Sequence, residues 1–70
     1  MFRIVLLDKE GYTIHDNNVD TFGEAKELAK YYLTDDWAIE CETTHEELDT
    51  HKVEIRNHYE VLLWDIFYKN

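Results

Sequence analysis

Apolar and polar positions alternate through the first quarter of the chain in the manner of β-strands. Residues 1–7 are largely apolar on both faces, so we predict a strand at the centre of a sheet. Residues 8–11 predict a hairpin connection, because the glycine at its end can adopt a positive φ. Residues 12–15 predict a returning second strand, and the polar residues 16–18 predict a turn.

A helical repeat follows these two strands. Thr21 and Glu24 have the spacing of a capping box, in which a threonine caps a helix that carries a glutamate three residues later. We therefore predict the main helix from Phe22 to about Leu33, with its apolar side chains on one stripe. The stripe consists of Phe22, Ala25, Leu28, Ala29 and Tyr32.

The middle of the chain returns to strand-like alternation. Residues 37–43 predict a third strand whose tryptophan, isoleucine and Cys41 face the core. Residues 44–48 match a second capping box and predict a single helical turn. Residues 52–56 alternate charged and apolar side chains and predict a fourth strand.

The last apolar segment, residues 59–68, has two interpretations. Its aromatic and branched residues favour a strand, and its apolar residues at helical spacing make a helix the competing interpretation. A regular strand would turn one apolar face away from the helix, which predicts a contact with a partner or a second copy. That face consists of Leu62, Trp64, Ile66 and Tyr68. The alternatives are a covering loop or a bulge at Asp65 that re-aims the strand.

These elements predict a single α+β domain over residues 1–70. Its antiparallel sheet has four to five strands in the order ββαβββ, with one main helix packed on one face. Three Phe, two Trp and five Tyr residues, together with the absence of proline, favour a folded chain over a disordered one. The single cysteine excludes an internal disulfide framework. The apolar run of residues 2–7 is too short for a signal peptide, so we expect a cytoplasmic protein that does not enter membranes.

Charge narrows the classes of partner. Sixteen Asp and Glu residues against seven Lys and Arg residues give a net charge of −9, which should repel nucleic acid and anionic membranes. Residues 35–49 contain no Lys or Arg. Their acidic residues, which we predict to form the partner-binding face, are Asp35, Asp36, Glu40, Glu42, Glu46, Glu47 and Asp49. On a strand, Glu40 and Glu42 would lie about 6.6–6.8 Å apart, a spacing comparable with successive phosphates. The alternative is that these acids only keep the protein soluble.

The sequence predicts neither a metal site nor a catalytic site. Cys41, His45, His51 and His58 do not form the two close pairs that structural zinc sites use. Cys41 is expected to be buried and unreactive. There is no glycine-rich phosphate loop, and a sheet with one helix leaves little volume for a pocket. We therefore expect no cofactor and no enzymatic activity.

A short, proline-free, aromatic-rich and acidic chain of this kind resembles the small proteins that phages encode against host defences, including anti-CRISPR proteins. The acidic run of residues 35–49 and the strand-helix-strand order around residues 21–33 carry the resemblance. It covers the chain as a type and matches no motif residue by residue. It implies a viral, DNA-mimicking inhibitor that occupies the nucleic-acid groove of a host defence complex. The alternative function is an assembly module that forms a homodimer, or docks on a larger complex, through the apolar strand face.

Overall fold

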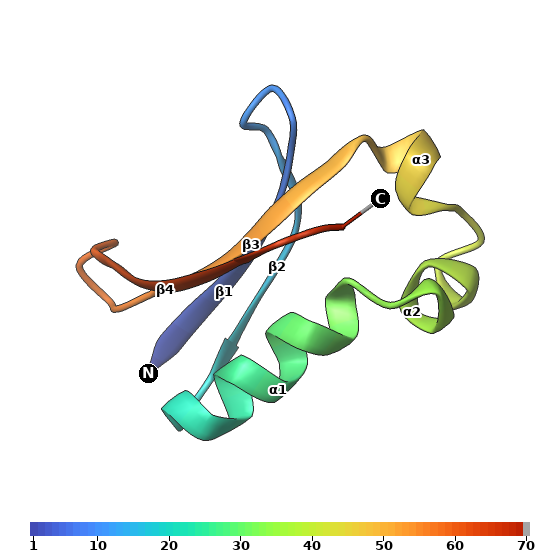
Figure 1. Ribbon diagram of the computed structural model, residues 1–70. Coiled ribbons are helices and arrows are strands. Elements are labelled where there is room, and N and C mark those ends of the chain that lie inside the picture. The colour runs from blue at the N-terminus through green and yellow to red at the C-terminus, as the bar shows by residue number, and fades with distance from the viewer. Residues whose placement is uncertain (70) are drawn as a thin grey trace.

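The computed structural model describes residues 1–69. An antiparallel sheet and three helices follow one another in the chain order ββαααββ (Figure 1). The strands are β1 (Phe2–Asp8), β2 (Thr13–Val19), β3 (Thr50–Arg56) and β4 (Leu62–Phe67). The helices are α1 (Phe22–Tyr32), α2 (Asp35–Glu40) and α3 (His45–Leu48). The predicted class, antiparallel α+β, is confirmed, whereas the predicted order ββαβββ is wrong.

The sheet has four strands in the order β2-β1-β3-β4, so β1 is central, as its two apolar faces predict. Residues 4–7 of β1 are all buried. Ile4 pairs with Ile55 of β3, and Leu6 pairs with Val53. A strand flanked on both sides and covered on both faces needs apolar side chains at successive positions.

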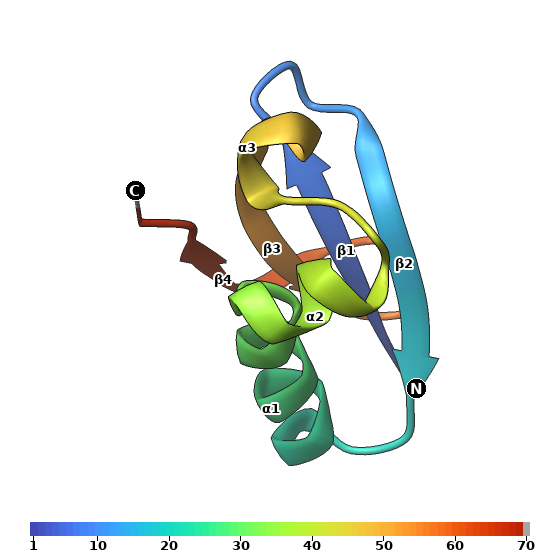
Figure 2. The same cartoon turned by 90° about the vertical axis from the view of Figure 1, so that its right-hand side faces the viewer.

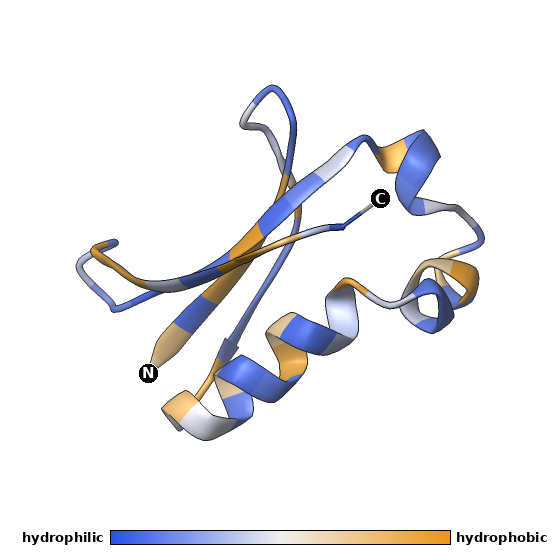
Figure 3. Ribbon diagram, viewed as in Figure 1, coloured by the Kyte–Doolittle hydropathy of each residue, from blue (hydrophilic) through white to orange (hydrophobic). Residues whose placement is uncertain are grey.

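The helix α1 packs against the sheet through its smallest side chains. Ala25 and Ala29 are fully buried and Tyr32 is nearly so, and all three join one core with the sheet residues Ile4 and Ile55. Alanine brings the helix backbone close to the strands and loses no side-chain entropy on burial. Figure 2 shows all three helices on the same side of the sheet, and Figure 3 shows apolar residues on α1 and β1.

The strand β2 is longer than predicted. Residues 16–18, predicted as a turn, pair with Arg3, Ile4 and Val5 of β1. Because β2 lies at the edge of the sheet, its polar side chains stay in water while its backbone is paired. The backbone pairing with β1 therefore outweighs the preference of these polar residues for a turn.

The predicted third strand, residues 37–43, is wrong. Its first half is the helix α2, which begins after Thr34, whose hydroxyl accepts a hydrogen bond from the Trp37 amide at 3.2 Å. Trp37 and Ala38 are both buried, and adjacent residues of a strand would point to opposite faces. Ile39 is 69% exposed, and Cys41, which the alternation predicts to be buried, is exposed.

The last segment forms the strand β4, as predicted, but a bulge changes its faces. Trp64 pairs with Ile55 and Leu62 pairs with Arg56, so Leu63 is the extra residue. Trp64 and Ile66 therefore point toward the helices and pack on the core, while Leu62 falls on the opposite face. The predicted surface of Leu62, Trp64, Ile66 and Tyr68 is thus not one exposed face. The bulge also lies at Leu63 rather than at Asp65.

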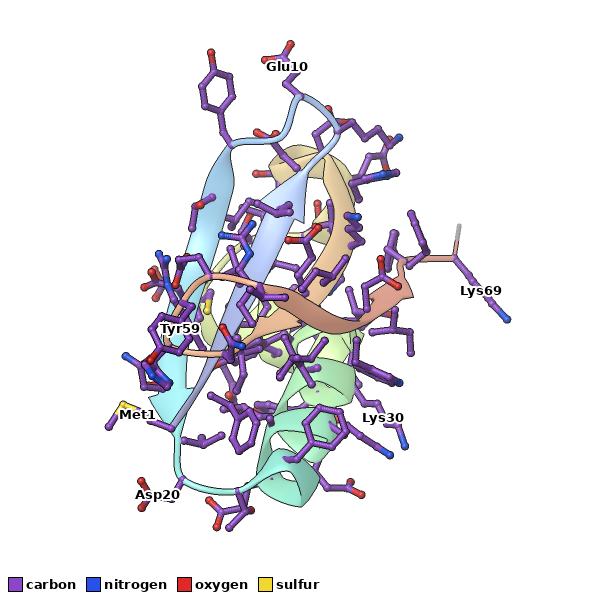
Figure 4. All side chains as sticks on the ribbon, turned by 90° about the vertical axis from the view of Figure 1, so that its left-hand side faces the viewer. Met1, Glu10, Asp20, Lys30, Tyr59 and Lys69 are labelled. Atoms are coloured by element: carbon purple, nitrogen blue, oxygen red, sulfur yellow. The ribbon has the colours of Figure 1, made fainter. Side chains whose placement is uncertain are left out.

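The face of the sheet away from the helices carries a connected chain of ion pairs. The β3–β4 hairpin curls over this face, and Tyr59 near its tip lies over β2 in Figure 4. The ion pairs link all four strands and the hairpin in the order Asp16, Arg3, Glu60, Arg56, Glu54, Lys52 and Asp65. Charges of opposite sign alternate along the chain, so each sheet cation has two carboxylate neighbours.

Candidate functional site

The two short helices α2 and α3 lie between the end of α1 and the start of β3 and carry the acidic run (Figure 1). All seven of its carboxylates are exposed. We call this set the acidic surface: Asp35, Asp36, Glu40, Glu42, Glu46, Glu47 and Asp49. The structure thus brings every predicted partner-binding acid to one end of the molecule, although the segment is helical rather than extended.

Threonine caps fix where these helices begin. Thr34 caps α2, and Thr44 caps α3 by accepting a hydrogen bond from the Glu47 amide at 3.1 Å. The acids that follow lie in the first helical turns, where a carboxylate is stabilised by the unpaired amides and the positive end of the helix dipole. They are Asp35, Asp36, Glu46 and Glu47. Helix stability therefore accounts for four of the seven acids.

The other three acids have no such explanation. Glu40 is the last residue of α2, Glu42 follows that helix with φ at 58°, and Asp49 follows α3 with φ at 56°. A side chain in this left-handed region is strained, more so for glutamate than for aspartate. Asp49 also forms an ion pair with Lys9 at 3.6 Å. Within residues 1–69 it is the one acid of this surface that has an ion-pair partner.

Aromatic rings hold the inner side of the two helices against the sheet. Trp37 of α2 lies 5.3 Å from the ring of Tyr32, 5.6 Å from His15 and 6.0 Å from His45, measured between ring centroids. The His45 ring in turn lies 4.7 Å from that of Tyr68. This row of rings supplies the apolar burial that two helices of four to six residues require.

His45 is buried, with 3% of its surface exposed, and both of its ring nitrogens are hydrogen-bonded. Nε2 lies 2.9 Å from the carbonyl oxygen of Thr34, and Nδ1 lies 2.8 Å from Oγ1 of Thr50. A carbonyl only accepts, so Nε2 carries the hydrogen. His45 thereby ties the start of α2 to the start of β3, and no ring nitrogen is left free for acid–base chemistry.

Glu40 connects α2 to α1. The phenol of Tyr31 donates a hydrogen bond to Oε2 of Glu40. This hydrogen bond, together with burial and the nearby carboxylate charges, raises the pKa of Tyr31 to about 12. The phenol remains neutral and can donate throughout the physiological range of pH.

A surface hollow of about 460 Å³ adjoins the acidic surface, although the sequence predicts a fold with little volume for a pocket. Its lining residues are Lys9, His45, Glu46, Asp49, Thr50 and Tyr68. They come from the β1–β2 turn, α3, β3 and the end of the chain, so no local motif could have indicated the hollow. Its charged groups lie in water at the rim, and His45 has no free nitrogen. The arrangement suits recognition of a charged group better than bond-making chemistry.

The predicted phosphate-like spacing of Glu40 and Glu42 is wrong. It assumed two side chains on one face of a strand, whereas Glu40 lies in a helix and Glu42 in a left-handed turn. The structure nevertheless keeps the acidic run of residues 35–49 apart from the paired charges of the sheet. On the sheet, Arg3, Lys52 and Arg56 are matched by carboxylates, and only Asp49 of the acidic surface has such a match within the described chain.

The candidate metal ligands do not come together. Among residues 1–69, no three His, Cys, Asp or Glu side chains are arranged to hold a metal ion. His51 packs on Phe67 of β4, and His58 packs on Tyr59 of the β3–β4 turn.

No family model, curated protein or solved structure matches this chain. Within the part of the chain that the structure describes, no helix is long and apolar enough to cross a membrane.

Proposed function

We propose that this protein is a non-enzymatic binding protein whose acidic surface docks on a basic, nucleic-acid-binding groove of a protein partner. The observation that carries the proposal is the segregation of charge. On the sheet, three cations and four carboxylates form one chain of ion pairs. At the α2–α3 end, seven carboxylates gather with a single ion pair, Asp49 to Lys9, within the described residues.

Glu42 supports a role beyond solubility. Acids that only solubilise can lie anywhere on the surface, and those in first helical turns stabilise their helices. Glu42 lies in no first helical turn, and it follows α2 in a left-handed conformation that glycine adopts at lower cost. A charged residue kept at a strained, exposed position is consistent with a contact that uses its charge.

The resemblance to small phage-encoded inhibitors adds a class of partner. On that basis we propose a host defence complex, whose nucleic-acid groove the protein would occupy as a stoichiometric inhibitor. Charge steers such an encounter, so association should be fast at low ionic strength and should slow as salt screens the two surfaces.

The test compares two variants with the same net charge. One neutralises the acidic surface by changing Glu40, Glu42, Glu46 and Glu47 to Gln. The matched control changes Glu10, Glu24 and Glu27 to Gln and Asp20 to Asn, all exposed positions outside that surface. Each variant is used to capture proteins from nuclease-treated bacterial lysate, and the captured proteins are identified by mass spectrometry.

The proposal expects a captured partner that itself binds nucleic acid and is displaced by added nucleic acid. The acidic-surface variant should lose this partner, and the control variant should retain it. If both variants lose the partner equally, net charge alone explains the binding. If both variants retain the partner, a role for the acidic surface is refuted.

A further inference from the structure

The two edges of the sheet differ in chemistry. The β2 edge carries exposed polar side chains at residues 15–18, which is how natural sheets prevent pairing with other chains. At the opposite edge, no strand within residues 1–69 pairs with the outer side of β4. Exposed apolar side chains gather on this strand and just before it. They are Val61, Leu62, Leu63 and Phe67, between 44% and 54% exposed.

The hydrogen-bond pattern shows which backbone groups of β4 face outward. The Tyr68 amide donates to the carbonyl oxygen of His51 on the β3 side at 2.9 Å. In an antiparallel ladder the paired residues alternate, so Ile66 and Trp64 also turn their amides and carbonyls toward β3. The amides and carbonyls of Asp65 and Phe67 therefore point to the open edge.

The one charge on this edge is already neutralised. Asp65 lies 3.3 Å from Nζ of Lys52, which also lies 5.3 Å from the centre of the Phe67 ring. The edge is thus locally neutral and apolar on a chain whose net charge is −9. An unpaired charged side chain on an edge strand normally opposes pairing with another chain. Here the Asp65 carboxylate is instead paired with Lys52 on the face of the sheet.

We propose that β4 pairs in antiparallel register with β4 of a second copy of this chain, about a twofold axis at Ile66. This register opposes Asp65 to Phe67 of the second copy, and both residues carry the outward backbone groups that the new ladder needs. It also opposes Trp64 to Tyr68 of the second copy. The two sheets then become one continuous sheet with an isologous interface.

Local charges disfavour one alternative register. An axis at Asp65 would place two carboxylates directly opposite each other, which is unfavourable. With the axis at Ile66, Asp65 of one copy lies beside the Phe67 ring of the other and close to the Lys52 that covers that ring. The bulge at Leu63 ends the regular part of the strand, so the symmetric pairing uses residues 64–68.

Salt distinguishes this interface from the acidic surface, and the two proposals are independent. Two copies of charge −9 repel each other, so added salt should strengthen the dimer while it weakens charge-steered binding to a basic partner. The test is sedimentation velocity from micromolar to about 1 mM protein, in low salt and in about 0.5 M NaCl. Concentration-dependent dimers that increase with salt support the proposal, and a monomer under all these conditions overturns it.

Two substitutions of one residue test the register. Phe67→Glu places a carboxylate opposite Asp65 of the second copy and should raise the dimer dissociation constant at least about tenfold. Phe67→Lys places a cation there and should raise it less. The matched control is Tyr12→Glu, which changes net charge equally at an aromatic residue that is 69% exposed in the β1–β2 turn. Equal effects of Phe67→Glu and Tyr12→Glu would overturn the proposal.

A disulfide tests the axis directly. At a non-hydrogen-bonded pair the Cα atoms of opposed residues lie about 4.5 Å apart, within the range that disulfides span. Ile66→Cys in a Cys41→Ser background should therefore cross-link two copies under mild oxidation. Tyr12→Cys in the same background should not. Circular dichroism confirms that each variant is folded, and cross-linking that favours Tyr12→Cys would refute the axis at Ile66.

Discussion

Arg3 of β1 and Glu60 of the β3–β4 turn form an ion pair with Nη1 and Oε1 2.5 Å apart, although 57 residues separate them along the chain. The same guanidinium binds Asp16 of β2 at 2.7 Å, and Glu60 also pairs with Arg56 at 3.2 Å. One arginine therefore connects the hairpin tip to the opposite edge strand. The hairpin is held over the sheet face on which Val5, fully buried, would otherwise be open to water.

The centre of this ion-pair chain predicts an acid-sensitive contribution to stability. Glu54 lies 2.9 Å from Lys52 and 2.7 Å from Arg56. Burial raises the pKa of Glu54, but hydrogen bonds from Lys52 and Arg56 outweigh burial and hold it below its ordinary value of 4.5. The charged form is thus favoured by folding. Its contribution is complete above pH 4.5 and is lost as the pH falls through the lowered pKa.

We expect Glu54→Gln to lower the free energy of unfolding by about 1–2 kcal/mol at neutral pH, and the difference from wild type should shrink below pH 4.5. Urea denaturation across this pH range measures it. Glu10→Gln, at an exposed position in the β1–β2 turn, is the control and should leave the curve unchanged. A constant difference at all pH values would contradict a role for the Glu54 charge.

A pair of substitutions separates the helical α2 from the strand that the sequence predicts. Trp37 is 7% exposed and Ile39 is 69% exposed, whereas a strand would bury both. Trp37→Ala should cost about 3–5 kcal/mol, a large share of the stability of so small a domain. Ile39→Ala should change stability by less than about 0.5 kcal/mol. Urea denaturation compares the two, and a large loss at Ile39 would favour the strand.

The hydrogen bond between Tyr31 and Glu40 predicts an alkaline transition. A phenol whose pKa is raised to about 12 binds its proton more tightly in the folded state than in the unfolded chain. Stability from this group is present below pH 10 and is lost as the pH rises toward 12. Glu40→Gln should lower the pKa of Tyr31 in an ultraviolet titration of the tyrosines. Glu42→Gln removes the same charge without touching Tyr31 and should leave the titration unchanged.

The left-handed turn after α2 predicts a stabilising substitution. Glu42→Gly relieves a backbone conformation with φ at 58° and should raise stability by about 1 kcal/mol, or roughly 4–8 °C in Tm. Glu42→Ala removes the same charge but keeps the strain, so it should give little gain in thermal denaturation. Equal gains from both substitutions would instead attribute the effect to relief of charge repulsion in the acidic surface.

Local signals predicted the elements that depend on local physics. The caps at Thr21 and Thr44 are hydrogen bonds within one helical turn, and both helices begin where the sequence indicates. The central place of β1 follows from its apolar side chains on both faces. The exposure of the seven acids follows from the cost of burying an unpaired charge, so the acidic surface could be predicted as a set.

The same kind of signal failed for residues 37–43. Alternation over a few residues is also compatible with a short helix, and the threonine cap at Thr34 favours the helix. What buries Trp37 beside Ala38 is the row of rings from His15 and Tyr32 to His45. These rings come from β2, α1 and α3, and their meeting point depends on how those elements pack.

The sequence by itself determined the α+β class, the main helix, the strand character of the last segment and the segregation of acidic residues, because caps, periodicity and charge act over a few neighbouring positions. Only the tertiary structure decided the faces of β4, where the bulge at Leu63 depends on the pairing with β3. It also decided the ion pairs of Arg3 and the bonds of His45, whose partners lie on other strands or helices. Such contacts form only when elements that are distant in the chain pack together, so no local sequence pattern can predict them.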